Sequence, residues 1–235
     1  MKLVTTEGSE DFASSAARFV ESRVRETPAI SLTLPTGRTP LGLYELLRDA
    51  HRERRFSLDQ ATVFMLDEYC DLPAYPADSF IEYLDRSLGD VIFNDSTTVR
   101  VLSPSRDPKE YDDALDLAGG LDLAIVGVGR NGHVGFNEPG DDPIARTHVV
   151  TLAPGTIAAN FRGVHERRRP TRAITIGLAD LRRARSILML VAGEHKRGTA
   201  ELLAAGIVDQ LVPATLLLEH DDLTIMMEGQ LLRGR

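Results

Sequence analysis

The side chains best suited to chemistry lie in one glycine-rich stretch that directly follows an apolar run. Residues 121–126 form that run, which is short and rich in branched side chains and therefore predicts a buried strand. Four glycines, one proline and two asparagines at positions 127–139 then rule out regular structure. This loop carries Asn131, His133 and Glu138, and an imidazole close to a carboxylate is a common pair in acid–base catalysis. We predict an active-site loop, with a plain turn around a hydrogen-bonded histidine as the alternative.

The same stretch also matches the dinucleotide-binding pattern, with glycines at positions 127, 129 and 132. In that pattern the glycines open an amphipathic helix. Here they run into residues 133–140, which have no helical period, so we expect neither a nicotinamide nor a flavin cofactor. The sequence also lacks the Gly-x-Ser-x-Gly of serine hydrolases and the His-Glu-x-x-His of zinc enzymes. A metal held by carboxylates stays open, although the cluster has a single histidine.

A second candidate site is the turn Pro-Thr-Gly-Arg-Thr-Pro at residues 35–40. It follows a predicted strand at 29–34 and precedes a helical pattern at 41–49, where Thr39 suits the N-cap and Pro40 the first helical position. A glycine turn at the start of a helix presents free backbone N–H groups to an anion. The turn therefore predicts an anion site, with an ordinary strand-to-helix turn as the alternative.

Three further features point to the same kind of chemistry. Asp67 and Glu68 follow the predicted strand 61–66, where burial of charge is costly unless it serves a function or a helix cap. Lys196 lies in the first turn of a predicted helix, where a cation opposes the helix dipole unless an anion sits beside it. Residues 154–172 are long, irregular and rich in arginine, including Arg162, which predicts a lid over the site.

Length and composition limit the classes of protein. The 235 residues fit a single domain over 1–235, and the net charge of −8 argues against nucleic acid or an anionic membrane as a partner. The one cysteine, Cys70, fits a reducing cytoplasm. The chain shows neither a signal peptide nor an apolar run long enough to span a membrane. We therefore expect a cytoplasmic protein that acts on a small molecule.

Strand and helix patterns alternate along the chain, which predicts an α/β fold with a single open, mostly parallel sheet flanked by helices on both faces. In such folds, ligands bind beyond the carboxyl ends of the strands, so the turn, the carboxylates and the glycine-rich loop should converge. The predicted strands are 29–34, 61–66, 98–102, 121–126, 149–152, 173–176, 186–191 and 223–227, and the predicted helices are 9–20, 41–49, 78–88, 108–117, 194–205 and 212–219.

At these residues the chain resembles the glucosamine-6-phosphate deaminase (isomerase) family, whose fold is Rossmann-like. The sister family of 6-phosphogluconolactonases shares the fold and the first motif, but its loop typically reads Asp-Gly-His-Thr-Ala-Ser-Leu-Phe-Pro. The matching stretches are Leu-Pro-Thr-Gly-Arg-Thr-Pro at 34–40, Leu-Asp-Glu-Tyr at 66–69, Gly-Val-Gly-Arg-Asn-Gly-His-Val-Gly-Phe-Asn-Glu-Pro at 127–139, Thr-Arg-Ala-Ile-Thr-Ile-Gly at 171–177 and, more weakly, Val-Pro-Ala-Thr at 212–215.

The resemblance implies conversion of glucosamine 6-phosphate and water to fructose 6-phosphate and ammonia, with no redox or metal cofactor. It makes Asp67 the base that moves a proton between C2 and C1, and His133 the residue that assists ring opening, oriented by Asn131 and Glu138. Many members carry aspartate where this chain has Asn131, and an amide cannot hold a negative charge beside the imidazole. The phosphate would meet Thr36, Gly37, Arg38, Thr39, Arg162 and Lys196, although some members have a small residue in place of Arg38.

Two alternatives remain beside this function. The first is a lactonase, which would hydrolyse a sugar-phosphate lactone on the same fold. The second is a non-catalytic sugar-phosphate sensor, but such regulators usually carry a DNA-binding domain for which 235 residues leave no room. The sequence leaves open whether the amino sugar is glucosamine or galactosamine 6-phosphate, whether the chain forms a homo-oligomer, and whether it has an allosteric effector.

Overall fold

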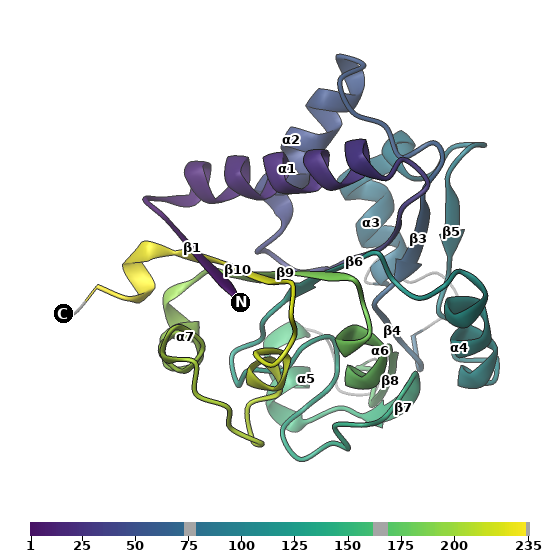
Figure 1. The fold of residues 1–235 in the computed structure, drawn as a ribbon. Helices are drawn as coiled ribbons and strands as arrows, with labels where there is room; N and C mark the ends of the chain where they lie inside the picture. The colour runs from purple at the N-terminus through teal and green to yellow at the C-terminus, as the bar shows by residue number, and fades with distance from the viewer. Residues whose placement is uncertain (73–78, 162–168, 234–235) are drawn as a thin grey trace.

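A seven-stranded parallel sheet forms the centre of the molecule (Figure 1). The computed structural model describes residues 1–72, 79–161 and 169–233. The strands, in the order in which they lie side by side, are β1 (Lys2–Thr6), β10 (Leu223–Glu228), β9 (Ser186–Val191), β6 (Leu123–Gly127), β2 (Ser31–Leu34), β3 (Thr62–Met65) and β5 (Thr98–Arg100). This arrangement confirms the predicted parallel sheet. It also adds β1, which was not predicted.

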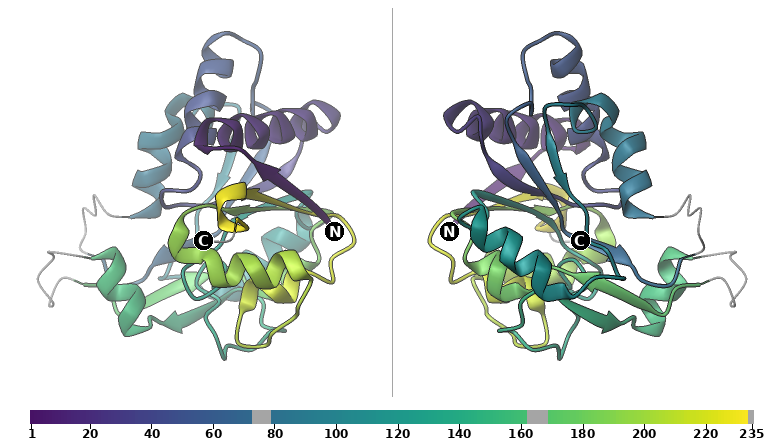
Figure 2. Two further views of the ribbon diagram at one scale, coloured as in Figure 1. Left: turned by 90° about the vertical axis from the view of Figure 1, so that its left-hand side faces the viewer. Right: turned by 90° about the vertical axis from the view of Figure 1, so that its right-hand side faces the viewer.

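Helices cover both faces of this sheet, as predicted. In Figure 1, α1, α2 and α3 lie above the sheet, and α6 and α7 lie below it; the side views of Figure 2 show the same two layers. None of the helices in the described part of the chain is long and apolar enough to cross a membrane. The helices are α1 (Ser9–Glu26), α2 (Leu41–Arg52), α3 (Phe80–Leu88), α4 (Pro108–Leu117), α5 (Pro154–Asn160), α6 (Leu178–Arg182) and α7 (Arg197–Ala205), with short 3₁₀ turns η1 (Gly89–Val91), η3 (Glu194–Lys196), η4 (Pro213–Leu217) and η5 (Gly229–Leu231).

Because helices cover both faces, the central strands are buried on both sides. Every residue of β9 and β10 is buried, which is why these strands appear in the sequence as nearly continuous apolar runs. The covering helices are instead amphipathic. In α1, Phe12, Ala16 and Val20 recur every four residues on the face that packs against the sheet, while the other face stays in water.

The order of the strands reverses between β2 and β6. From β2 the chain continues outward through β3 and β5, whereas from β6 it continues in the opposite direction through β9 and β10. The Asp122 carboxylate fastens the two central strands, because it accepts hydrogen bonds from the Ser31 backbone N–H at 2.8 Å and the Ser31 hydroxyl at 2.9 Å. Open parallel sheets bind ligands beyond the carboxyl ends of the strands at such a reversal. This places the predicted turn after β2 and the predicted loop after β6 at the same edge.

A second, smaller sheet lies below the main one, where β8 (Arg172–Thr175) pairs antiparallel with both β4 (Asp67–Tyr69) and β7 (His148–Thr151). The sequence predicted two of these strands without separating them from the main sheet, and it predicted Asp67-Glu68 as a strand end rather than a strand. Four aromatic rings pack this sheet against its neighbours, with centroids 4.7–5.8 Å apart: Tyr69, Phe80, Phe136 and Phe161. The cluster thereby joins β4 to α3 and to the glycine-rich loop.

The predicted lid is described in part. Residues 154–160, expected to be irregular, form helix α5, with Pro154 in its first turn, a position where the missing N–H costs no hydrogen bond. Arg162 and its neighbours through 168 lie outside the described residues. The structure therefore shows a helix at the start of this segment, and the position of Arg162 stays a prediction.

Candidate active site

The glycine-rich loop folds back on itself because its glycines allow contacts that side chains would prevent. The Gly129 N–H donates to the His133 carbonyl at 2.8 Å, and the His133 ring lies directly over Gly129. A Cβ on Gly129 would come within 2.1 Å of His133 Nε2, so no other residue fits there without moving the imidazole. Gly132 and Gly135 turn the chain with φ values of 82° and 58°.

Asn137 anchors this loop to the second sheet. Its side-chain amide donates to the carbonyls of Val134 at 2.8 Å and Ile176 at 2.9 Å. The neighbouring Phe136 N–H donates to the Thr175 hydroxyl at 3.2 Å. Asn137 is 1 % exposed, so it supports the loop from inside and does not face the substrate side.

The side chains of His133, Asn131 and Glu138 form one hydrogen-bonded chain. The Asn131 amide donates from Nδ2 to Glu138 Oε2 at 2.6 Å, which leaves its Oδ1 as the acceptor that lies 2.7 Å from His133 Nδ1. Because an amide oxygen can only accept, His133 carries a hydrogen on Nδ1. The neutral ring then has its lone pair on Nε2, to which no group in the described part of the chain donates a hydrogen bond. The relay therefore directs the Nδ1 hydrogen of His133 toward Asn131 and leaves Nε2 available as an acceptor.

Glu138 is a buried carboxylate with several donors. Besides Asn131, the Thr156 hydroxyl of α5 donates to Oε1 at 2.7 Å, and His133 Nδ1 lies 3.5 Å from the same oxygen. Burial raises the pKa of Glu138, but the hydrogen bonds and charge of His133, together with those of Thr156 and Asn131, outweigh burial and lower this pKa to about 2. Glu138 is therefore a fixed negative charge at neutral pH.

Sequence reasoning did not find Thr156. It lies 18 positions from Glu138, in a segment that was expected to be irregular. Threonine hydroxyls in short helices are common and most contact their own backbone, so the residue type gave no signal.

Asp67 is buried without hydrogen-bond donors to its carboxylate among the described residues, and it is 6 % exposed. Burial, and secondarily the charge of Glu68, raise the pKa of Asp67 well above its usual range. The carboxylate faces the glycine-rich loop, since a Cβ on Gly135 would lie 3.5 Å from Asp67 Oδ2. The structure thus brings together Asp67 and the loop that carries His133.

Glu68 points the other way, as the two-residue alternation of a strand predicts. Its carboxylate accepts backbone hydrogen bonds from Tyr69 at 2.8 Å, Phe80 at 3.0 Å and Ile81 at 3.2 Å, and so caps the start of α3. Burial raises the pKa of Glu68, and these three bonds oppose the increase. The two neighbouring carboxylates therefore have different roles: Glu68 holds a helix, and Asp67 is free to accept a proton.

Two of the residues predicted to bind an anion, one after β2 and one after β9, contact each other. Lys196 Nζ donates to the Thr39 hydroxyl at 2.9 Å, although the two residues lie 157 positions apart. The prediction that Thr39 caps the following helix was wrong: α2 begins after Pro40 without a side-chain cap, and the Thr39 hydroxyl serves Lys196 instead. Gly37 turns with φ 89°, and its carbonyl accepts from the Tyr83 hydroxyl at 2.6 Å. Arg38 is exposed beside this turn.

Lys196 is 7 % exposed and has no ion pair with a described carboxylate. Burial lowers its pKa to about 8, while the charge of Glu228 opposes the decrease. A buried ammonium group next to a hydroxyl and a glycine turn is suited to an anion such as phosphate. A bound anion would compensate for the unfavourable interaction between Lys196 and the start of the helix.

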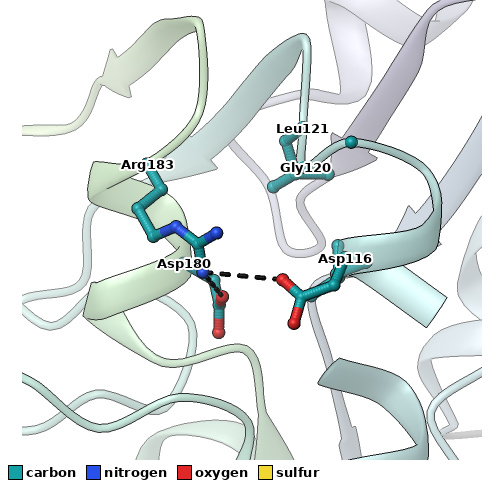
Figure 3. A pocket seen from close by; sticks show the side chains of 7 residues that line it. Asp116, Gly120, Leu121, Asp180 and Arg183 are labelled. Atoms are coloured by element: carbon teal, nitrogen blue, oxygen red, sulfur yellow. Dashed lines mark ion pairs between the residues drawn. The ribbon is translucent and has the colours of Figure 1, made fainter. Parts of the chain in front are cut away.

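A small cavity near charged residues does not resemble a ligand site. It measures about 40 Å³ and lies between α4 and α6, lined by Leu115, Asp116, Gly119, Gly120, Leu121, Asp180 and Arg183 (Figure 3). The Arg183 guanidinium spans it, 3.5 Å from Asp116 and 3.7 Å from Asp180. Arg146 pairs with the same two carboxylates, so the charges that line the cavity are neutralised within the protein. Among the described residues, no cluster of histidine, cysteine and carboxylate side chains could hold a metal ion.

Comparison with known proteins agrees with this geometry. The family model described as glucosamine-6-phosphate isomerases/6-phosphogluconolactonase matches residues 5–226. The glucosamine-6-phosphate deaminase of Halalkalibacterium halodurans is 34% identical over 241 residues, covering 99% of this chain and 97% of that protein. The deaminase of Mycoplasma mycoides subsp. mycoides is 32% identical over 231 residues, covering 97% of this chain and 95% of that one.

Solved structures give the same picture of the fold. A monomeric glucosamine-6-phosphate deaminase superposes with a TM-score of 0.87 at 30% identity, covering 99% of both chains. The 6-phosphogluconolactonase of Thermotoga maritima superposes with a TM-score of 0.73 at 18% identity, covering 97% of this chain and 98% of that one. At 18% identity, the similarity to this lactonase is evidence for the fold of the chain and not for its activity.

The two carboxylates of β4 should have opposite effects on stability. Because Asp67 has a raised pKa, the folded protein loses stability as the pH rises from the unfolded pKa of about 4 towards the raised value. Asp67→Asn removes that loss and should raise the free energy of unfolding at pH 7 by at least about 1 kcal/mol, with no gain at pH 3. Glu68→Ala should lower it by about 1–3 kcal/mol, because three backbone N–H groups lose their acceptor. Urea denaturation of both variants measures this; destabilisation by Asp67→Asn at pH 7 would contradict it.

The charge of Lys196 should control anion affinity. Since its pKa is about 8, the affinity for inorganic phosphate should fall as the pH rises through 8, because the ammonium loses its proton. The total loss should be about 1.5–3 kcal/mol, as for a hydrogen bond to a charged group. Calorimetric titration from pH 7 to 10 measures this, and Lys196→Met should bind weakly at every pH. An affinity that stays constant to pH 10 in the parent would show that Lys196 does not bind the anion.

Proposed function

This chain belongs to the family of glucosamine-6-phosphate isomerases and 6-phosphogluconolactonases, and we propose that within it the chain is a glucosamine-6-phosphate deaminase. The enzyme converts glucosamine 6-phosphate and water to fructose 6-phosphate and ammonia. The observation that carries this most strongly is the buried carboxylate of Asp67, which accepts no hydrogen bond from the described residues and lies beside the loop of His133. The full-length match to deaminases above 30% identity supports the same activity over lactone hydrolysis.

The first step is opening of the sugar ring. His133 Nε2 takes the proton from the C1 hydroxyl and returns one to the ring oxygen, which leaves an open-chain aldehyde. Asn131 holds the Nδ1 hydrogen in place, and the fixed charge of Glu138 stabilises the imidazolium that forms. Thr156 in turn keeps Glu138 in position.

The second step moves a proton between adjacent carbons. Asp67 removes the proton from C2 and delivers it to C1, on one face of an enediol-type intermediate, while the C1 oxygen gains a proton and the amine nitrogen loses one. The resulting imine at C2 is hydrolysed by water, which releases ammonia and leaves the ketone of fructose 6-phosphate. The raised pKa of Asp67 suits this role, because a base with a pKa closer to neutral accepts and releases a proton more evenly.

The third part of the proposal is the phosphate site. Thr36, Gly37, Arg38 and Thr39 after β2 and Lys196 after β9 would hold the phosphate, with the Lys196–Thr39 contact as support. Arg162, outside the described residues, would complete it. We place the enzyme in the cytoplasm, where a single unpaired cysteine stays reduced.

A coupled assay for ammonia and fructose 6-phosphate tests the function. Glucosamine 6-phosphate should be consumed with equal release of both products, and unphosphorylated glucosamine should be a very poor substrate because it lacks the group that Lys196 binds. Galactosamine 6-phosphate and 6-phosphogluconolactone serve as parallel substrates. Hydrolysis of the lactone without release of ammonia from glucosamine 6-phosphate would assign the chain to the sister activity.

Replacement of Asp67 tests the proton transfer. Asp67→Asn should lower kcat by at least ~10²-fold, the lower range for a positioned base. In heavy water the parent should place deuterium at C1 of fructose 6-phosphate, and the variant should lose this exchange together with ammonia release. Glu68→Gln is the matched control, because it removes the neighbouring charge on the other side of β4 and should cost less activity. Parental turnover by Asp67→Asn would locate the base elsewhere.

The amide at position 131 gives a second test. Asn131→Asp would bring another carboxylate to the 2.6 Å contact with Glu138, which should raise the pKa of Glu138 from about 2. The variant should therefore show an additional ionisation in kcat/KM between pH 4 and 7 that the parent lacks. Gln60→Glu, an exposed residue, adds the same charge far from the site as a control. Identical pH profiles for Asn131→Asp and the parent would exclude Glu138 from ring opening.

A further inference from the structure

The turn after β2 has two backbone N–H groups, those of Thr36 and Arg38, that donate to no acceptor in the described part of the chain. Gly37 lies between them with a φ of 89°, and a Cβ added there would meet no atom within 4 Å. The turn is therefore open at this point, and glycine allows its backbone more conformations than any other residue. Without a restraint, binding of an anion would have to order this turn, and the affinity would fall by the cost of ordering.

Two tyrosine hydroxyls restrain the turn. Tyr44 of α2 donates to the Pro35 carbonyl at 2.5 Å, and Tyr83 of α3 donates to the Gly37 carbonyl at 2.6 Å. The Tyr44 side chain is fully buried, at 1 % exposure, and Tyr83 is half-buried. Each hydroxyl therefore fixes the direction of one carbonyl of the turn from a neighbouring helix.

A fixed carbonyl also fixes the N–H of the next residue, because the C=O and N–H of a planar trans peptide point in opposite directions. The Pro35 carbonyl thus directs the N–H of Thr36, and the Gly37 carbonyl directs that of Arg38. Both N–H groups point away from the tyrosine hydroxyls. The two tyrosines come from α2 and α3 above the sheet, whereas Lys196 precedes α7 in the layer below it (Figure 1).

The helix that carries Tyr83 is itself held at its start. The N–H groups of Phe80 and Ile81 donate to the Glu68 carboxylate at 3.0 and 3.2 Å, and Tyr83 follows within the next turn of α3. Glu68 is the neighbour of Asp67 in β4. Helix α3 therefore connects the strand that carries the proposed base to the turn of the proposed phosphate site.

We propose that Tyr44 and Tyr83 are positioning residues of the phosphate site, which hold the turn after β2 in the conformation that binds the phosphate. The inference rests on the proposed function, since it assigns the turn to the phosphate of the same substrate. Neither hydroxyl can donate to the anion, because each gives its hydrogen to a carbonyl. Both tyrosines therefore act through the backbone, and their loss should reduce affinity more than the rate of the chemical step.

Replacement by phenylalanine removes each hydroxyl and keeps the ring and the charge. Tyr83→Phe should raise the Kd for inorganic phosphate and the KM for glucosamine 6-phosphate roughly two- to fivefold, as expected for one neutral hydrogen bond. Tyr44→Phe should raise both roughly three- to tenfold, because the Pro35 carbonyl is buried away from water. In both variants kcat should stay within about twofold of the parent, which is the pattern of a residue that serves binding. Calorimetric titration with phosphate and the ammonia assay measure these constants.

Tyr111→Phe is the matched control. The Tyr111 hydroxyl lies 2.8 Å from the Met65 carbonyl and 3.0 Å from the Arg100 carbonyl, so this variant also loses a hydrogen bond from a tyrosine to the backbone, far from the turn in the sequence. It should lose stability in urea denaturation and bind phosphate as the parent does. Phosphate affinity and KM in Tyr83→Phe equal to those of Tyr111→Phe would overturn the positioning role, and so would a fall in kcat at unchanged KM. If Tyr44→Phe does not fold, Tyr83→Phe decides alone.

The phosphate titration requires no turnover and so separates failure of this inference from failure of the function. If the parent releases no ammonia but Tyr83→Phe binds phosphate more weakly than Tyr111→Phe, the deaminase assignment fails and the positioning role stands. If ammonia is released and both variants bind phosphate equally well, the positioning role is wrong and the deaminase assignment stands.

Discussion

Two adjacent carboxylates are buried on opposite sides of β4, and the candidate site depends on the difference in the hydrogen bonds that they accept. Glu68 accepts hydrogen bonds from three backbone N–H groups, of which those of Phe80 and Ile81 lie at the start of α3. Asp67 receives no such donor, so its charge is costly in the folded protein. The cost of burying the Asp67 charge is not offset by hydrogen bonds from the described residues, whereas that of Glu68 is. Pairing of β4 with β8 holds both residues in these orientations.

In the glycine-rich loop, too, some residues hold the backbone in place and others orient the side chain of His133. Asn137 and Phe136 tie the loop to β8 and its continuation at Ile176, while Asn131 and Glu138 set the tautomer of His133. The amide of Asn131 lies between the imidazole of His133 and the carboxylate of Glu138, so it fixes the orientation of the ring without adding a second negative charge. The groups to which we assign proton transfer are therefore oriented by neighbours that take no part in it.

Much of this could be read from the sequence. Buried apolar runs predicted the strands of the main sheet other than β1, and glycine, histidine and carboxylate spacing predicted the loop. The errors came from residues whose role depends on distant partners. Asp-Glu-Tyr is a poor strand sequence, and it forms β4 because β8 pairs with it and α3 needs its carboxylate. Thr39 has the local signature of an N-cap, but a lysine 157 positions away takes its hydroxyl.

The pairing of β2 with β6 has a consequence for how the protein is made. Ser31 and Asp122, which fasten these strands, lie 91 positions apart, so the ribosome completes β2, β3 and β5 before the partner strand exists. Until then one edge of β2 stays open to pairing with other chains. The proposed site draws on residues from both sides of this late contact, with Asp67 before β6 and His133 after it. A nascent or truncated chain that ends before β6 therefore lacks β6, β9 and β10, has an open edge prone to aggregation, and lacks the loop that carries His133.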